Sequence, residues 1–304
     1  MYHNNSIFAL IKQKKYTFMR ILVTGGAGFV GSHLCEVLAS NTENTVVSLD
    51  NYSTGKEANH VPGVTYIVGD TKDIEKHVTE IPDIVYHLGE YARTSESFNE
   101  PEKVWEYNTH GTFRVLEYCR KNSIKKLVYA GSSTKLADGG DGRNQSPYAW
   151  TKAANTELVQ RYGEWFGVPY AIVYFYNVFG GREMEEGSYA TLIGIFKRLT
   201  RAGAPLTVVS PGTQIRSFTH VDDIVRGITL AAEKGSGDGY CLGPRESFTV
   251  HDIAKMYGGE ITMLPEKPGD RKTVAIDLEK TERDLGWKAE KSVKDYIAQF
   301  VTTL

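Results

Sequence analysis

The feature that most constrains the fold is a short apolar run that ends in a glycine-rich turn and leads directly into a helical pattern. The run RILVTG spans residues 20–25, and the helical pattern covers residues 29–38. Between them, TGGAGFVGSHL places Gly25, Gly28 and Gly31. Glycines at this spacing permit a tight turn, a close backbone approach to a pyrophosphate and close packing of helix on strand. Free N–H groups at the start of the helix can then bind phosphate oxygens. The stretch therefore predicts a dinucleotide-binding unit.

The alternation of strand and helix continues along the chain. Further apolar runs lie at residues 45–50, 64–70, 83–89, 125–133 and 169–177. Long helical patterns separate several of them, notably Glu102–Asn122 and Tyr148–Phe166. Continuous apolar strands that alternate with helices are typical of a parallel sheet covered on both faces. The predicted fold class is therefore α/β, a Rossmann-type doubly wound parallel sheet with a smaller C-terminal α/β substrate-binding lobe.

Asp50 closes the second apolar run, TVVSLD. An acid at this position accepts hydrogen bonds from the hydroxyls of an adenosine ribose, and it repels a 2′-phosphate. We therefore predict that the dinucleotide is NAD and not NADP.

Three segments follow from this pattern. Residues 1–18 are predicted to be a flexible extension, because their apolar run at 7–11 is too short for a signal peptide or a membrane span. Residues 19–177 are predicted to form the NAD-binding Rossmann domain. Residues 178–304 are less regular and are predicted to form mainly the substrate-binding lobe, with 220–234 as a helix that packs back on the first domain.

The composition argues against several classes of function. The chain has 35 basic and 37 acidic residues, so it lacks the basic excess typical of proteins that bind nucleic acid or membranes. Its three cysteines have no CxxC spacing and its eight histidines no HxxxH pair, so no metal site is predicted. Separate, reduced thiols are typical of a cytoplasmic protein.

The stretch SPYAWTKAAN sets Tyr148 four residues before Lys152. Residues at this spacing are neighbours on one face of a helix, and a nearby cation favours the phenolate form of a tyrosine. Tyr148 is thus a candidate acid/base. The same spacing at Tyr52 and Lys56 encloses Ser-Thr-Gly, which predicts a turn instead. The alternative for Tyr148 and Lys152 is that their spacing arises by chance. The other motifs of the chain decide between a catalytic pair and a chance spacing.

The glycine spacing, Asp50 and the Tyr148/Lys152 pair together resemble the extended short-chain dehydrogenase/reductase family of NAD-dependent sugar-nucleotide epimerases and dehydratases. The resemblance runs from about residue 19 to the end of the chain. It includes LDNYSTGK, YHLG, NTHGT, YAGSS, YFYNVFG, RSFTHVDD, KPGD and DLGW, in the order of the family. It implies an NAD-dependent enzyme with the fold predicted above.

The resemblance implies three sets of site residues and no metal ligand. The catalytic set is Ser132, Tyr148 and Lys152. The cofactor-binding set is Gly25, Gly28, Phe29, Val30, Gly31, Asp50, Asn51, Tyr52, Ser53, Thr54, Gly55, Asp70, Thr71, Leu88, Gly89, Asn108, Tyr148, Lys152 and Tyr176. The substrate-binding set is Glu90, Arg93, Ser133, Asn177, Arg216 and Lys267.

Within these sets, Ser132 would hydrogen-bond the reacting oxygen, Tyr148 would be the acid/base and Lys152 would hold the nicotinamide ribose. The planar donor fork of Arg216 suits a phosphate oxygen. The alternatives are that Ser132 and Ser133 only end a strand, and that Arg216 only forms a surface ion pair.

The chain departs from the family pattern in four places. Residues 135–137 are KLA where the family has Val-Tyr-Gly. Residues 90–93 follow YHLG with EYAR where many relatives have small residues, so an unusual sugar pocket is expected. Lys267 stands where an arginine is common, which keeps the charge and loses the fork. Val209 offers no aromatic ring for a nucleobase, so the nucleotide is left open between UDP, GDP and another.

Three functions remain open at this point. The first is an NAD-dependent nucleotide-sugar epimerase that transiently oxidises a sugar hydroxyl, at C4, to a ketone. The second is a dehydrogenase that releases a 4-keto sugar. A dehydratase is less favoured, because the Asp–Glu pair that it needs is replaced by Ser133 and Thr134. The third is a non-enzymatic NAD-binding sensor, against which the intact Ser132, Tyr148 and Lys152 argue.

The expected partners are a nucleotide-sugar substrate and a second copy of the chain. Both Glu102–Asn122 and Tyr148–Phe166 carry apolar stripes wider than one core contact requires. The resemblance implies that these two helices pair across a homodimer interface. No nucleic-acid or membrane partner is expected, and the expected location is the cytoplasm.

Overall fold

The computed structural model of the chain describes residues 18–266, 272–273 and 276–304. The predicted extension therefore lies outside the described residues, apart from its last residue. Lys267, predicted to bind substrate, also lies outside them.

Within the described chain, seven parallel strands form the central sheet, in the spatial order β11-β6-β5-β4-β1-β2-β3. Their bounds are β1 Arg20–Thr24, β2 Thr45–Asp50, β3 Val64–Val68, β4 Ile84–His87, β5 Lys126–Ser132, β6 Tyr170–Phe175 and β11 Gly237–Leu242. Leu22 of β1 pairs in register with Val47 of β2 on one side and Val85 of β4 on the other. The strand order reverses between β1 and β4, where sheets of this kind bind ligands at the carboxyl ends of the strands.

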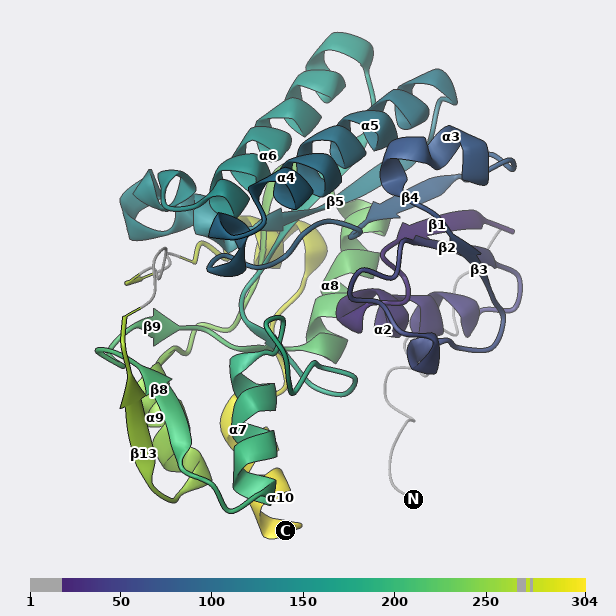
Figure 1. Cartoon of the computed structure of the whole chain (residues 1–304). Helices are drawn as coiled ribbons and strands as arrows, with labels where there is room; N and C mark the ends of the chain where they lie inside the picture. Colours follow the sequence, from purple (N-terminus) through teal and green to yellow (C-terminus); the bar gives the residue numbers. More distant parts are fainter. Residues whose placement is uncertain (1–17, 267–271, 274–275) are drawn as a thin grey trace.

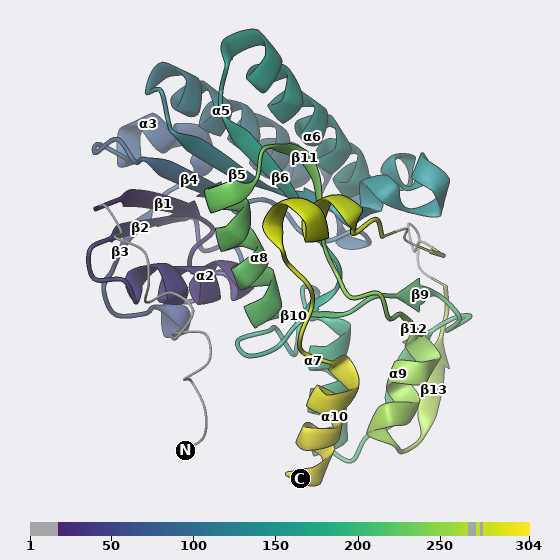
Figure 2. The ribbon, with the colours of Figure 1, turned by 180° about the vertical axis from the view of Figure 1, so that it is seen from behind.

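Helices cover both faces of the sheet (Figures 1 and 2). On one face lie α3 (Ile74–His77), α5 (Gly111–Lys121) and α6 (Pro147–Phe166), and on the other lie α2 (Phe29–Ala39) and α8 (Val221–Lys234). Because both faces are covered, the central strands are apolar on both sides, and every residue of β4 is buried. The predicted doubly wound α/β fold is confirmed.

Local sequence sets the limits of the helices that carry the site. Ser146 caps α6, since its Oγ accepts a hydrogen bond of 3.0 Å from the backbone N–H of Ala149. Gly167 ends the same helix with a left-handed φ of 68°. The helix expected at Glu102–Asn122 is instead three joined segments, because a π-helical stretch widens its middle. These are α4 (Pro101–Val104), η4 (Trp105–His110) and α5.

A second apolar cluster forms the smaller lobe, below the sheet in Figure 1. Three strand pairs shape it, namely β7 (Val178–Phe179) with β10 (Thr219–His220), β8 (Leu206–Val209) with β13 (Ile261–Leu264), and β9 (Ile215–Arg216) with β12 (Phe248–Thr249). Its helices are α7 (Leu192–Arg201), α9 (Val250–Tyr257) and α10 (Val293–Thr302). Short helical turns join the remaining elements, at η1 Glu57–Asn59, η2 Thr71–Asp73, η3 Glu96–Phe98, η5 Ser133–Leu136, η6 Asp138–Asn144 and η7 Thr281–Leu285.

The chain after residue 177 contributes to both apolar clusters. Helix α8 packs against α2, β5 and β6, and β11 extends the sheet beside β6. Trp287 is fully buried in the first cluster, and its indole N–H donates to the backbone oxygen of Asp223 at 2.9 Å. The predicted boundary between an NAD-binding domain at 19–177 and a substrate-binding lobe at 178–304 stays a prediction. No helix among the described residues has the length and apolar character that crossing a bilayer requires.

Candidate active site

Two adjoining cavities lie at the carboxyl ends of the central strands. The first has a volume of about 290 Å³ and runs from the glycine turn after β1 past the ends of β2 and β4 to α6. The second has a volume of about 430 Å³ and is bounded by η5, the end of β6 and the loop before α7. The residues that line both are Ala92, Arg93, Tyr148, Phe175 and Val178. These five, which we call the shared wall, separate the two cavities.

The glycine turn closes one end of the first cavity. Gly25 has a φ of +75°, and a Cβ atom there would lie 2.8 Å from the Cα of Gly89. A Cβ atom at Gly31 would lie 2.0 Å from the carbonyl oxygen of Gly25. No side chain caps α2 at Gly28, so the first N–H groups of the helix are open to an anion. The turn therefore fits the pyrophosphate of a dinucleotide.

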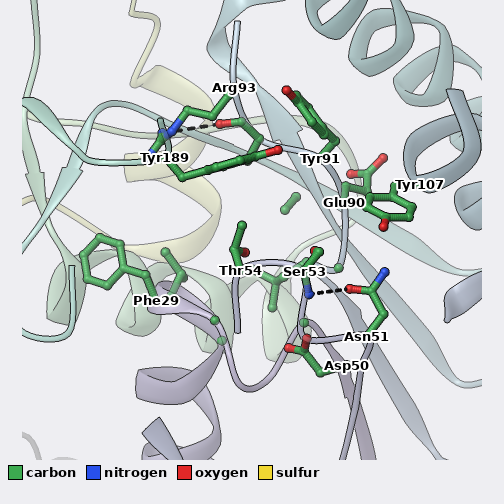
Figure 3. A pocket seen from close by; sticks show the side chains of 18 of the residues that line it. Phe29, Asp50, Asn51, Ser53, Thr54, Glu90, Tyr91, Arg93, Tyr107 and Tyr189 are labelled. Atoms are coloured by element: carbon green, nitrogen blue, oxygen red, sulfur yellow. Dashed lines mark hydrogen bonds between the residues drawn. The ribbon is translucent and has the colours of Figure 1, made fainter. Parts of the chain in front are cut away.

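Asp50 lies at the end of β2, next to this turn (Figure 3). Its Oδ2 accepts a hydrogen bond from the N–H of Ala27 at 2.9 Å, and its Oδ1 accepts one from the N–H of Tyr52 at 2.8 Å. Burial raises the pKa of Asp50, and these two backbone bonds oppose the rise. Each carboxylate oxygen keeps a further lone pair, so both can accept from the hydroxyls of a ribose.

The structure brings the predicted catalytic side chains together. Tyr148, in the first turn of α6, donates a hydrogen bond of 3.1 Å from its hydroxyl to Oγ of Ser132, at the end of β5. Oγ of Ser132 also lies 2.8 Å from Oγ1 of Thr134. Lys152 follows one turn after Tyr148 and lines the first cavity. A reacting hydroxyl beside Tyr148 would therefore meet a phenol and a serine hydroxyl at once.

Lys152 is held in a closed environment. Its ammonium forms an ion pair with Glu90, and the two side chains are only 6% and 4% exposed. It also donates to the backbone oxygen of Ala130 and lies 4.5 Å from the ring centroid of Tyr129. These contacts fix the charge at one point of the cavity wall.

Glu90 is the centre of a buried hydrogen-bond network. Its Oε1 accepts from Thr112 at 2.9 Å, Asn155 at 2.9 Å and Tyr129 at 3.1 Å, and its Oε2 binds Lys152. Burial alone would raise the pKa of Glu90, but the Lys152 ammonium, His87 and the hydrogen bonds from Lys152 and Thr112 together lower it. The role of Glu90 as a sugar ligand stays a prediction, and its contacts point to a second role in holding Lys152.

His87 extends the same network below the cavity. Its Nδ1 lies 2.8 Å from Oγ1 of Thr24, and its Nε2 lies 3.0 Å from Oγ1 of Thr112. Burial lowers the pKa of His87 to about 4, against a smaller opposite effect of Glu90. The imidazole is therefore neutral at physiological pH and links two threonine hydroxyls.

Most of the predicted cofactor residues line the first cavity, namely Gly25, Gly28, Phe29, Val30, Gly31, Asp50, Asn51, Ser53, Thr54, Thr71, Leu88, Gly89, Tyr148 and Lys152. The structure does not place Tyr52, Gly55, Asp70, Asn108 and Tyr176 in the lining. Some of these contact residues of the lining without facing the cavity. Asn108, for instance, accepts a 2.7 Å hydrogen bond from the N–H of Tyr91 and so holds the loop that carries the shared wall.

Tyr176, predicted to bind the cofactor, lines neither cavity. It is buried, and its hydroxyl lies 3.3 Å from Sγ of Cys241. Its neighbour Phe175 lines both cavities instead. Successive residues of an extended chain point to opposite sides, so these two neighbours have different surroundings.

The predicted substrate residues are spread over the two cavities. Glu90 lines the first, Ser133 and Asn177 line the second, and Arg93 lines both. Arg216 is buried in β9, outside both linings, and donates to the backbone oxygen of Ile215 at 2.9 Å.

Sequence analysis missed several lining residues, among them Tyr107, Met184, Tyr189 and Thr191. Three of these belong to the irregular segment between β7 and α7, which has no periodic pattern that could have marked them. Tyr189 packs near Arg93, with its ring centroid 5.9 Å from the guanidinium carbon (Figure 3). Across the described residues, no group of three or more His, Cys, Asp and Glu side chains is placed to hold a metal ion.

Comparison with known proteins identifies the family. A solved structure of UDP-glucose 4-epimerase from Thermus thermophilus, in complex with NAD, is 28% identical and has a TM-score of 0.85, covering 93% of this chain and 98% of that one. UDP-glucuronic acid 4-epimerase from Bacillus cereus, solved with UDP-glucuronic acid and NAD, is 26% identical with a TM-score of 0.83, over 94% and 99% of the two chains. The dTDP-glucose 4,6-dehydratase of Salmonella typhimurium is 26% identical over 93% of this chain and 92% of its own length.

The model of the family described as NAD dependent epimerase/dehydratase matches residues 21–243, which include the glycine turn, Asp50, Ser132, Tyr148 and Lys152. The predictions of an enzyme and of NAD as its cofactor are confirmed. The chain belongs to the NAD-dependent epimerase/dehydratase family of nucleotide-sugar enzymes.

Proposed function

We propose that this protein is an NAD-dependent nucleotide-sugar epimerase that inverts C4 of the sugar by transient oxidation of its hydroxyl to a ketone. The observation that carries the proposal is the hydrogen bond between Tyr148 and Ser132 at the shared wall. These two hydroxyls lie between a cavity that fits a dinucleotide and a second cavity with room for a sugar, which supports a role for them in acid/base catalysis.

The residues act on the proton of the reacting hydroxyl. Tyr148 takes this proton as the hydroxyl is oxidised, and Ser132 hydrogen-bonds the same oxygen throughout. NAD, when bound, supplies the acceptor and later the donor of the hydride. The ketone then turns in the second cavity, and Tyr148 returns the proton to the oxygen. Lys152 stays charged beside the phenol and favours the phenolate.

A dehydratase is less favoured by the side chains near the reacting position. Loss of water needs a further acid and base beside the sugar, and the positions after Ser132 hold Ser133 and Thr134. Both are buried, and Thr134 is hydrogen-bonded to Ser132. A dehydrogenase that releases the 4-keto sugar uses the same catalytic residues, and it is the second candidate. A non-enzymatic NAD sensor would leave the aligned Tyr148 and Ser132 hydroxyls without a use.

For the cofactor, we propose that the glycine turn binds the pyrophosphate and Asp50 the adenosine ribose. Lys152 is proposed to hold the nicotinamide ribose, with Glu90 fixing its position. Phe175 is proposed in place of Tyr176 as the ring beside the nicotinamide, because Phe175 lines the cavity.

A panel of nucleotide sugars, analysed by mass spectrometry and NMR after incubation with the NAD-loaded protein, tests the proposal. An unchanged mass with inverted C4 identifies an epimerase, loss of two hydrogens a dehydrogenase, and loss of water a dehydratase. Deuterium placed on C4 should remain in the epimerised product, because the same hydride is returned. Exchange of that deuterium with solvent would contradict the proposed route.

We further propose a homodimer formed through the helices of residues 102–122 and 148–166. Trp105 of η4 and Trp150 of α6 stack with ring centroids 5.9 Å apart, and each is 44% exposed. Phe113 lies on the neighbouring α5 and is also exposed. Such an aromatic patch is typical of an interface. Sedimentation at several concentrations should show a dimer, and Trp150→Glu should shift it to monomer. A wild-type monomer at high concentration would refute the proposal.

A cytoplasmic location is proposed from the cysteines. Cys35, Cys119 and Cys241 are all buried and free, and burial raises the pKa of Cys35 and of Cys119 to about 12. Unreactive, unpaired thiols are compatible with a reducing compartment.

A further inference from the structure

Arg93 is a partly buried cation on the wall between the two cavities. It forms no ion pair with any acid among the described residues. Its Nη1 donates only a long hydrogen bond of 3.4 Å to the backbone oxygen of Ala92, and its Nε is buried with no partner. Burial lowers the pKa of Arg93, and the nearby Tyr148, Tyr189 and Tyr91 hydroxyls oppose this effect. A guanidinium stays charged at neutral pH, and a buried N–H donor without a partner is costly to the fold.

The acids around Arg93 are directed elsewhere. Glu90 pairs with Lys152, and Glu100 pairs with Lys103. Glu96 lines the second cavity but not the first, and it forms no ion pair with Arg93. The described part of the chain therefore leaves the charge of Arg93 to be balanced by a ligand.

The position of Arg93 narrows the choice of ligand. Two kinds of anion enter a site of this type, the phosphates of the nucleotides and a carboxylate on the sugar. The cofactor pyrophosphate has its place at the start of α2, where Gly28 and Gly31 leave room for it. Arg93 instead lies on the shared wall with Tyr148, whose hydroxyl marks the reacting carbon. An anion there is next to the sugar ring.

We propose that this protein acts on a nucleotide-linked sugar acid, and that Arg93 binds the ring carboxylate beside the reacting carbon. The inference rests on the proposed epimerase function and specifies its substrate class. A carboxylate matches the planar donor fork of arginine, so one ligand group supplies both the missing charge and a partner for the unpaired Nε. A carboxylate on C5 of a hexose is adjacent to C4, so both groups reach the shared wall together.

Equilibrium binding of matched sugar pairs tests this inference. The probes are UDP-glucose against UDP-glucuronic acid, and GDP-mannose against GDP-mannuronic acid, each titrated into NAD-loaded protein that carries Tyr148→Phe to stop turnover. We expect the acid to bind at least about tenfold more tightly than the neutral sugar on at least one nucleotide, since charged hydrogen bonds of this kind are strong.

Variants at Arg93 then assign the preference. Arg93→Met should remove it by weakening only the acid, and Arg93→Lys should retain part of it, as the charge remains without the fork. Arg143→Met is the matched control, because Arg143 pairs with Glu157 and lines neither cavity. NAD affinity and the thermal melting temperature should be unchanged in Arg93→Lys. This variant therefore still tests the preference for the acid if Arg93→Met fails to fold.

Equal or tighter binding of the neutral sugar on both nucleotides would overturn the inference. So would an Arg93→Met variant that weakens NAD, or both members of a pair equally, since Arg93 would then bind a phosphate. Binding of the acid with no turnover by the Tyr148 protein would overturn the proposed epimerase and leave the role of Arg93 standing. Epimerisation of neutral sugars without preference for the acid would overturn the role of Arg93 and leave the proposed epimerase standing. Failure of all four probes to bind would overturn both proposals.

Discussion

The two cavities are built in different ways. The lining of the first includes six glycines, beside the ends of β2 and β4, which are held in place by the hydrogen bonds of the sheet. They are Gly25, Gly28, Gly31, Gly69, Gly89 and Gly131. The second is lined by side chains of the loop at 92–96, of η5 and of the segment at 187–195. Glycines let a ligand approach the backbone closely in the first cavity, whereas Gly187 is the one glycine in the lining of the second. This difference supports the proposal that the first cavity binds the cofactor of the family, and that the second distinguishes between substrates.

The strongest test of this comparison is Tyr148→Phe, at the wall between the two. It removes one oxygen and keeps the ring, so NAD affinity should persist while kcat falls by roughly 10²–10⁴-fold, as expected for loss of an acid/base group. Single-turnover kinetics on the identified substrate, with NAD binding measured in parallel, give both numbers. Near-normal turnover would mean that the phenol only packs.

Breaking the Glu90–Lys152 pair tests the rigid side of the first cavity. Glu90→Gln leaves a buried ammonium without its counter-charge, so the free energy of unfolding should fall by roughly 3 kcal/mol. Urea denaturation of the wild type and the variant measures this difference in the free energy of unfolding. The double variant Glu90→Gln with Lys152→Met removes both charges and should lose less than the sum of the single variants. Additive losses would show that the two side chains do not interact.

Asp50→Ala should affect the first cavity alone. Loss of two ribose hydrogen bonds to a carboxylate should raise the Kd for NAD by roughly 10–100-fold and reduce the preference over NADP. Isothermal titration with each dinucleotide checks both effects, and kcat at saturating NAD should stay near that of wild type. Equal or tighter binding of NADP by the wild type would refute the role of Asp50.

The smallest effect concerns pH and the network under the first cavity. The pKa of His87 is lowered to about 4 in the fold, so an unfolded chain takes up its proton first as the pH falls. The contribution of His87 to stability is therefore fully present above about pH 6.5 and is lost as the pH falls towards 4, with a change of roughly 1–2 kcal/mol by pH 5. Urea midpoints at pH 7.5 and 5 should differ less in His87→Asn than in wild type.

The parts of the site that sequence could predict are those set by local backbone rules. Gly25 and Gly31 were identifiable because a side chain at either position would collide with neighbouring backbone, and any glycine turn between strand and helix has the same requirement. Tyr148 and Lys152 were identifiable because helical spacing places them on one face.

The parts that sequence could not predict depend on distant contacts or on register. The pairing of Glu90 with Lys152 joins residues far apart in the chain, so neither position alone predicts it. A strand motif does not state which of two neighbours faces the cavity, and here Phe175 lines it whereas Tyr176, the predicted cofactor residue, does not. Strand β11 was missed because its sequence GDGYCL contains two glycines and pairs with β6 through an irregular register.

The shared wall has a consequence for the order of events in solution. Since Ala92, Arg93, Tyr148, Phe175 and Val178 border both cavities, a ligand that orders these side chains in one cavity also shapes the other. Such coupling is reciprocal, so the nucleotide sugar would strengthen binding of the cofactor by the same free energy with which the cofactor strengthens binding of the sugar. If the two ligands bind as proposed, we expect the dinucleotide to be held most tightly while a partly converted sugar remains beside it.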